Sequence, residues 1–158
     1  MSEVLAYFLT WTTYGTRLHG DPRGTVDRYH NTPGTPVLPS DPKRQAFVTK
    51  RMRDAPFLLN NLSRPIADQA IRDHAAIRNW DILALNVRTN HVHVVVNCRG
   101  THSPDEARQQ FKTWGTRRLI NAGEATSDTR VWTDDGSTRY LDSAHSLMSA
   151  INYVLNCQ

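Results

Sequence analysis

A chain of 158 residues can bury one hydrophobic core but is short for two, so the sequence predicts one domain over residues 1–158. Apolar residues make up 39% of the chain, and no apolar run approaches the roughly 18 residues of a membrane-spanning helix, which excludes disordered and membrane-spanning classes. Two cysteines exclude a disulfide framework, and no basic signal-peptide start is present, so we expect a cytoplasmic protein despite its modest +4 charge.

The first half of the chain predicts a strand, a long loop and a helix. Residues 5–12 are rich in aromatic and β-favouring types and predict a strand. Residues 14–42 carry too many glycines and prolines for a regular element and predict a long loop, whose role the sequence leaves open. A helix is expected over 63–80 with Ser63 as its cap, and its apolar side is expected to contain Ile66, Ala70, Ile71, a core His74 and Ile77.

The second half predicts a hairpin, a capped helix, a strand and a final helix. Residues 81–87 alternate apolar side chains and are separated by three residues from a second strand, 91–97. Ser103 and Glu106 form a capping-box pattern that opens a helix with Ala107, Phe111 and Trp114 facing inward. Residues 138–141 predict a last strand, or a small hairpin with 131–133 across a turn at 134–137, and a helix over 143–157 follows. This order predicts an α+β, ferredoxin-like antiparallel sheet (a split βαβ arrangement) with helices on one face and the other face open.

Two histidines mark the start of the second hairpin strand. Side chains alternate along a strand, so His91, His93 and Val95 should share one face, while Val92, Val94 and Val96 should face the helices. Two imidazoles at this spacing can converge on one metal ion and leave coordination positions open for substrate oxygens. A pair of hydrogen-bonded histidines on a partly exposed face is the alternative.

The last helix carries a tyrosine away from its expected apolar side. The stripe formed by Ala144, Leu147, Met148, Ile151, Val154 and Leu155 predicts the buried side of this helix, and Tyr153 should project nearly opposite to it. Tyr140 is the nearest other tyrosine, but it falls in the preceding strand.

The chain resembles the single-tyrosine transposases with an HUH (His-hydrophobic-His) signature, in particular the REP-associated and insertion-sequence types. The resemblance lies in NHVHVVV (90–96) after Asn79-Trp80, in FLTWTTYGTRLHGDPRG (8–24), and in the segment from TRYL to AINYVLNCQ (138–158). These segments span nearly the whole chain in the family's order, and they are more specific together than the His-x-His pair alone.

The resemblance implies a strand transferase that cuts single-stranded, hairpin-forming DNA through a 5′-phosphotyrosine. His91 and His93 would bind Mg²⁺ or Mn²⁺, and Tyr153, carried on the C-terminal helix, would be the nucleophile. Some relatives place a glutamine ligand one helical turn beyond the tyrosine. That position is Cys157 here, so Asn156 and Gln158 are the candidate third ligands, with Asn156 better placed on the helix. Relatives act as monomers or as homodimers, and the sequence does not choose between these states.

Two acid-free basic segments predict contacts with a polyanion, although a solvated helix face is the alternative for each. The candidate DNA contacts are Lys50, Arg51, Arg53, Arg108, Lys112, Arg117 and Arg118. Trp114 is expected in the core, with base stacking as the alternative. Two other functions stay open: a transposase-derived domain that binds DNA without cutting it, and a metal-dependent hydrolase. The histidine-triad hydrolases would need a third histidine where this chain has Val95.

Overall fold

The computed structural model describes residues 3–15 and 56–156. The candidates Lys50, Arg51, Arg53 and Gln158, and nearly all of the 14–42 segment, lie outside this range. In chain order the elements are β1 (Ala6–Thr12), α2 (Ser63–Arg78), β2 (Asp81–Val87), β3 (His91–Asn97), α3 (Pro104–Asn121), β4 (Ser137–Leu141) and α4 (Ala144–Asn156). None of the helices in the described ranges is long and apolar enough to cross a membrane.

The strands form one sheet in the order β2-β3-β1-β4, and every neighbouring pair is antiparallel. The central strand β1 places Thr10 opposite His93 and Thr12 opposite His91 on one side, and Phe8 opposite Arg139 on the other. The predicted α+β sheet with a split βαβ arrangement is confirmed. Its register brings Thr10 and Thr12 of the first strand beside the histidine pair.

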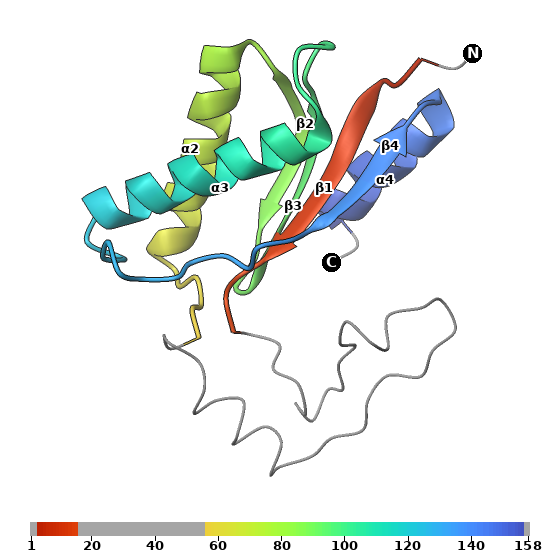
Figure 1. Ribbon diagram of the computed structural model, residues 1–158. Helices are drawn as coiled ribbons and strands as arrows, with labels where there is room; N and C mark the ends of the chain where they lie inside the picture. The colour runs from red at the N-terminus through yellow and green to blue at the C-terminus, as the bar shows by residue number, and fades with distance from the viewer. Residues whose placement is uncertain (1–2, 16–55, 157–158) are drawn as a thin grey trace, which may run out of the picture.

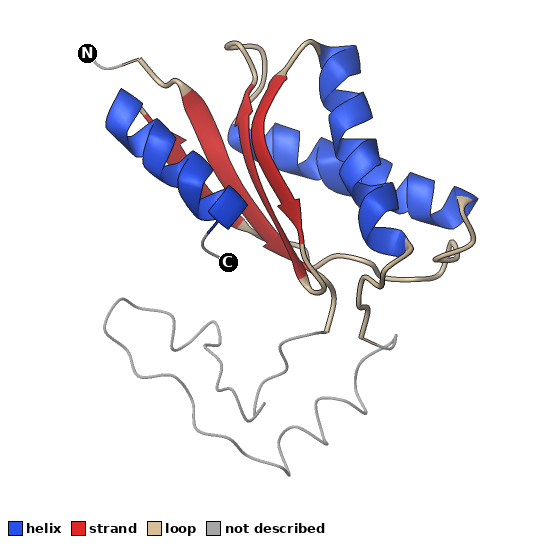
Figure 2. Ribbon diagram, turned by 180° about the vertical axis from the view of Figure 1, so that it is seen from behind, coloured by secondary structure: helices blue, strands red, loops and turns tan. Residues whose placement is uncertain are grey.

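Helices lie on both faces of the sheet. Figure 1 shows α2 and α3 together on one side, and Figure 2, seen from behind, shows α4 on the opposite side. Val92, Val94 and Val96 are buried under α2 and α3, as the alternation of β3 predicts. Val95 is equally buried under α4, where it packs with Ala150 and Val154. The second face is therefore partly covered, and the expectation that it is open is wrong.

The ends of α2 and α3 depend on polar side chains. Ser103 and Glu106 form the predicted capping box, in which each side chain accepts a hydrogen bond from the other residue's backbone N–H. The predicted cap at Ser63 is wrong, because the N-cap residue is Leu62 and Ser63 already lies in the helix. The Asn60 carboxamide instead accepts hydrogen bonds from the backbone N–H groups of Leu62 and Ser63. Asn60 therefore supplies the acceptor that this helix start needs.

Two expectations about local packing also fail. Ile77 is 78% exposed, because it lies in the last turn of α2, beyond the part of the helix that contacts the core. Strand β2 does not alternate strictly, because its pairing with β3 shifts between Ile82 and Ala84 and leaves Leu83 as the extra residue. This irregularity lets Ile82 and Leu85 both pack with the α2 and α3 core, while Ala84 faces α4.

Candidate active site

His91 and His93 lie side by side on the α4 face of the sheet. The centroids of their rings are 4.7 Å apart, and the ring planes meet at 78°. Both residues are partly exposed, so the rings combine a fixed position with access from solvent. This arrangement matches the shared face that the strand alternation predicts.

Each ring has its Nδ1 atom held by a neighbouring polar side chain. The Nδ1 of His91 is 2.7 Å from the Oδ1 of Asn90, and the Nδ1 of His93 is 2.8 Å from the Oγ1 of Thr10. Because an amide oxygen only accepts, the Nδ1 of His91 carries a proton, so Nε2 is the ring nitrogen that could bind a cation. Metal-binding histidines are commonly oriented through the second ring nitrogen in this way. Thr10 could not be identified from the sequence, because its role appears only once the β1 to β3 register is known.

The His93 ring is held in its neutral form. Partial burial lowers its pKa from 6.5 to about 4, and the charges of His91 and Arg88 add to this effect. A neutral imidazole needs no proton removed before it donates its lone pair. The environment of His93 therefore suits a ligand to a cation.

Tyr153 lies beside this pair. Its ring centroid is 5.7 Å from that of His93 and 6.0 Å from that of Phe8, and the residue is 44% exposed. The expectation that Tyr153 projects away from the buried side of α4 is wrong. The helix packs on the sheet through Ala150 and Val154, so Tyr153 lies on the flank of the buried side.

The packing face of α4 is narrower than its apolar stripe. Met148 and Leu155 belong to the stripe, yet they are 61% and 55% exposed. A hydrogen bond from the Asn86 Nδ2 to the backbone oxygen of Val154 fixes the end of the helix against β2. The small Ala150 is buried where α4 approaches the sheet.

Tyr140 lies on the other face. It pairs directly with Tyr7 across β1 and β4, and the two rings meet edge to face at 5.7 Å. Since Phe8 contacts both His93 and Tyr153, its neighbour Tyr7 points to the α3 side. The sheet therefore separates Tyr140 from the histidine pair, and Tyr153 is the tyrosine that the fold brings to it.

The third-ligand candidates remain unassigned. Asn156 is exposed one turn beyond Tyr153, and its Nδ2 donates a hydrogen bond to the Oδ1 of Asn152 at 2.9 Å. Within residues 3–15 and 56–156, no third His, Cys, Asp or Glu joins the pair in a group that could hold a metal ion. Two imidazoles whose Nδ1 atoms are held by side chains still fit a divalent cation that takes its remaining ligands from water and substrate oxygens. The donor set thus fits Mg²⁺ or Mn²⁺ bound openly.

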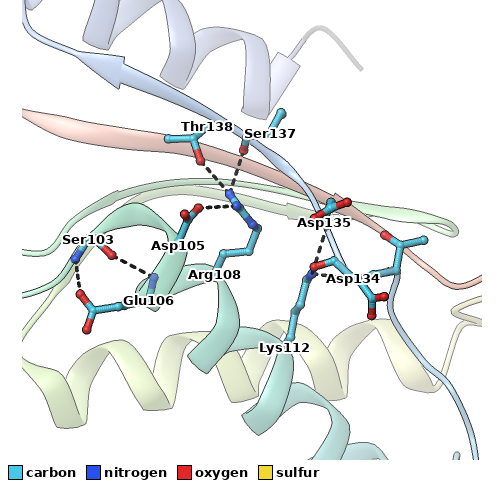
Figure 3. Close-up of polar contacts among 10 residues, drawn as sticks. Ser103, Asp105, Glu106, Arg108, Lys112, Asp134, Asp135, Ser137 and Thr138 are labelled. Atoms are coloured by element: carbon cyan, nitrogen blue, oxygen red, sulfur yellow. Dashed lines mark hydrogen bonds and ion pairs between the residues drawn. The ribbon is translucent and has the colours of Figure 1, made fainter. Parts of the chain in front are cut away.

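Two of the predicted DNA contacts are used inside the protein (Figure 3). The Lys112 ammonium donates hydrogen bonds to the backbone oxygens of Thr133, Asp134 and Asp135 at 2.8, 3.0 and 3.1 Å, and the residue is 6% exposed. Arg108 donates to the Thr138 hydroxyl and forms an ion pair with Asp105. Both side chains hold the chain around the start of β4 against α3, which uses all three donors of the Lys112 ammonium and leaves the Arg108 side chain only 12% exposed.

Arg117 and Arg118 are more accessible. The Arg117 guanidinium lies over the Trp114 ring, 4.9 Å from its centroid, and Arg118 pairs with Asp73 at 2.7 Å. Trp114 is 39% exposed and stacks on the buried His74, so it lies at the edge of the core rather than inside it. His74 is the core histidine that the sequence predicts, since its Nε2 is 2.7 Å from the Gln110 amide oxygen.

Arg139 is a further residue that the sequence analysis missed. It lies opposite Phe8 in the β1 to β4 register, so its exposed side chain starts from the same face of the sheet as Tyr153. The available signal was its place one residue before Tyr140 in the predicted last strand, because neighbours on a strand face opposite sides. An arginine on this face suits contact with a phosphate.

Comparisons with known proteins place the chain in a family. It matches the family model described as transposase IS200-like over residues 44–155. It is similar in structure to a REP-associated tyrosine transposase bound to a REP hairpin, with 12% identity and a TM-score of 0.52 over 98% of this chain and 67% of that one. A candidate transposase from Deinococcus radiodurans R1 gives 16% identity and a TM-score of 0.53 over 99% of this chain and 92% of that one.

None of the curated proteins matches the chain. The solved structures share so little sequence with it that they show a common fold and no more. The family model, however, covers most of the chain, including β3 with its histidine pair and α4 as far as Leu155. This protein belongs to the family of IS200-like transposases.

Proposed function

We propose that the protein is an endonuclease and strand transferase for single-stranded, hairpin-bearing DNA, with Tyr153 as its nucleophile. The observation that carries the proposal is the position of the Tyr153 ring, 5.7 Å from His93, whose ring is in turn 4.7 Å from His91. Residues from the middle of the chain and from its last helix thus meet on one partly exposed face. A phosphodiester at the two imidazoles would be close to the phenol oxygen.

The reaction exchanges one ester bond for another. The Tyr153 oxygen attacks the phosphorus, and the bond from phosphorus to the 3′-oxygen breaks. One DNA end is then joined to Tyr153 through a 5′-phosphotyrosine, and the other DNA end has a free 3′-hydroxyl. The phenol proton passes to solvent, and the departing 3′-oxygen takes up a proton. Because the covalent bond retains the energy of the original ester, a second 3′-hydroxyl can reverse the step and join strands.

The chain's own residues orient this reaction. Asn90 and Thr10 fix the two imidazoles, so that both Nε2 atoms can face the phosphate. Phe8 and His93 support the Tyr153 ring from the sheet, which limits the directions from which its hydroxyl can attack. A bound Mg²⁺ or Mn²⁺ supplies charge neutralisation and in-line placement of the phosphate. Arg139 starts from the same face and is proposed as a phosphate contact.

The test is a covalent adduct assay on denaturing gels. A panel of single-stranded oligonucleotides with and without hairpins is incubated with the protein and Mn²⁺, and we expect an adduct that resists denaturation. Tyr153→Phe should abolish it and retain DNA binding, whereas the matched Tyr140→Phe, on the other face, should retain it. A chelator, His91→Gln or His93→Gln should each remove it. No adduct on any oligonucleotide would overturn the proposal.

A second candidate is a DNA-binding domain that no longer cuts. It is favoured by one observation, which is that no third His, Cys, Asp or Glu accompanies the histidine pair among the described residues. The same assay separates the two functions. Binding of hairpin DNA without an adduct at any Mn²⁺ concentration would support the binding domain.

A further inference from the structure

A hollow of about 420 Å³ lies between α3 and the segment 129–134, on the side of the sheet that carries α2 and α3. Its volume is within the range of small-molecule sites. One wall is a single face of α3, formed by Gln109, Thr113 and Arg117, which are spaced one helical turn apart. The other wall includes Arg130 and the nearly buried Trp132.

The charge of the hollow is positive. Its lining contains Lys112, Arg117 and Arg130 against one acid, Asp134. The Lys112 ammonium donates its hydrogen bonds to backbone oxygens, but its positive charge still contributes to the lining of the hollow. Asp134 offsets little, because it is 89% exposed and 3.7 Å from Arg130 in an ion pair of the weak surface type.

Each of the two arginines stacks on an aromatic ring. Arg117 lies 4.9 Å from the centroid of Trp114, and Arg130 lies 4.5 Å from that of Tyr14. A guanidinium stacked on a ring loses less freedom when it binds a ligand, and its N–H groups at the edge stay available. Arg117 makes no ion pair with any residue that the structure describes. Phosphate is one of the anions that guanidinium groups bind through strong, charge-assisted hydrogen bonds.

The hollow lies at the same end of the sheet as the histidine pair. Thr12 pairs with His91 on one side, and on the other its backbone oxygen accepts a hydrogen bond from the Thr133 N–H. The 131–133 segment therefore forms the edge of the sheet at this level, two strand spacings, or about 10 Å, from β3. A DNA strand that passes over this edge goes from the Tyr153 face to the hollow.

We propose that this hollow binds one nucleotide of the DNA substrate strand, with Arg117 and Arg130 gripping its backbone phosphate. The inference rests on the proposed function for the identity of the ligand, because the hollow itself selects a phosphate ester. It adds a second point of contact to the same strand that Tyr153 attacks. A DNA strand that contacts both the Tyr153 site and the hollow, on opposite sides of the sheet edge, has its orientation on the protein fixed as well as its position.

The test measures binding of a fluorescein-labelled oligothymidylate by anisotropy at several salt concentrations. All proteins carry Tyr153→Phe, so that binding is read without cleavage. Each lost phosphate contact lowers the slope of log affinity against log salt by about 0.7 for a single strand. Because both side chains contact the same phosphate, Arg117→Gln with Arg130→Gln should lower the slope by about 0.7 and weaken binding about fivefold near 0.1 M salt. The matched pair Arg72→Gln with Arg99→Gln, ion-paired outside the hollow, should not.

Three further variants protect the test against misfolding. Arg117→Lys with Arg130→Lys retains both charges and should retain the slope. Gln109→Glu, at an exposed position in the hollow, should weaken binding, whereas Asn121→Asp, exposed further along α3, should not. An unchanged slope in the double glutamine variant, or an equal loss in the double lysine variant, overturns the inference. Failure of the adduct assay leaves this slope unaffected, so the two proposals fail separately.

A calorimetric titration with thymidine monophosphate distinguishes a DNA strand from a free nucleotide. We expect no saturable binding of the monophosphate at micromolar concentrations, because one phosphate contributes only a small part of the affinity for a strand. Saturable binding that disappears in Arg117→Gln with Arg130→Gln would assign the hollow to a free nucleotide and overturn the DNA assignment.

Discussion

Replacing Thr10 with valine should weaken divalent cation binding about tenfold without unfolding the protein. The Thr10 hydroxyl lies 2.8 Å from the Nδ1 of His93, and this contact orients the ring. Valine has nearly the same shape and keeps the β-branched side chain that suits the central strand β1. Loss of one such orienting bond to a metal-binding histidine typically lowers metal affinity 10- to 100-fold. Because His91 keeps its bond to Asn90, we expect the lower end, about 1.4 kcal/mol.

The assay follows free Mn²⁺ by electron paramagnetic resonance during a titration of the protein, so it does not depend on DNA cleavage. Thr12→Val is the matched control, since Thr12 lies on the same face of the same strand but bonds to the Thr133 hydroxyl at 3.0 Å. We expect less than a twofold change for the control, and urea unfolding within about 1 kcal/mol of the parent for both variants. Equal Mn²⁺ affinities for Thr10→Val and the parent would refute the claim that Thr10 positions His93. An equal loss in both variants would refute it as well.

Three further outcomes follow from the same geometry. Lys112→Met should cost about 2 kcal/mol in urea unfolding, because it removes three charge-assisted bonds to the carbonyls of 133–135, and a cost below 0.5 would contradict that role. Gly136→Ala should destabilise by more than about 2 kcal/mol, since its Cβ would meet a backbone oxygen at 2.4 Å, whereas Gly115→Ala, with its nearest contact at 3.4 Å, should change stability by less than about 1. Because the pKa of His93 falls from 6.5 to about 4 on folding, the unfolded chain binds more protons in that window, and stability should drop as pH falls through it. Between pH 7 and 5 the free energy of unfolding should drop by about 1 kcal/mol after allowance for solvent screening. His93→Gln should remove this drop, and the same drop in the variant would assign it to another group.

The sheet was predictable because its signals are local. The alternation of β3 correctly places His91 and His93 on one face and Val92, Val94 and Val96 on the other. The capping box at Ser103 depends only on residues three positions apart, so sequence spacing is sufficient to find it. The predictions at Ser63 and Leu83 failed because contacts outside the local pattern set the structure there. At Ser63 the Asn60 carboxamide caps the helix instead, and at Leu83 the pairing of β2 with β3 is irregular.

The position of α4 was not predictable from its own periodicity. Its apolar stripe is wide enough to allow several rotations, and the rotation that occurs is chosen by the close contact of Ala150 with the sheet. One signal on the sheet was available, since Val95 shares its face with the histidines and an apolar β-branched side chain there indicates a covering element. The same limit applies to Lys112, whose three acceptors belong to a segment 21 to 23 residues away.

The central claim is that the Tyr153 oxygen forms the bond to DNA. The most direct measurement is mass spectrometry of the peptide that carries the nucleotide, after the parent protein has reacted with single-stranded DNA and Mn²⁺ and been digested. The account predicts a 5′-phosphate linked to Tyr153 and to no other residue. A nucleotide linked to Tyr140, or to any residue other than Tyr153, would contradict it.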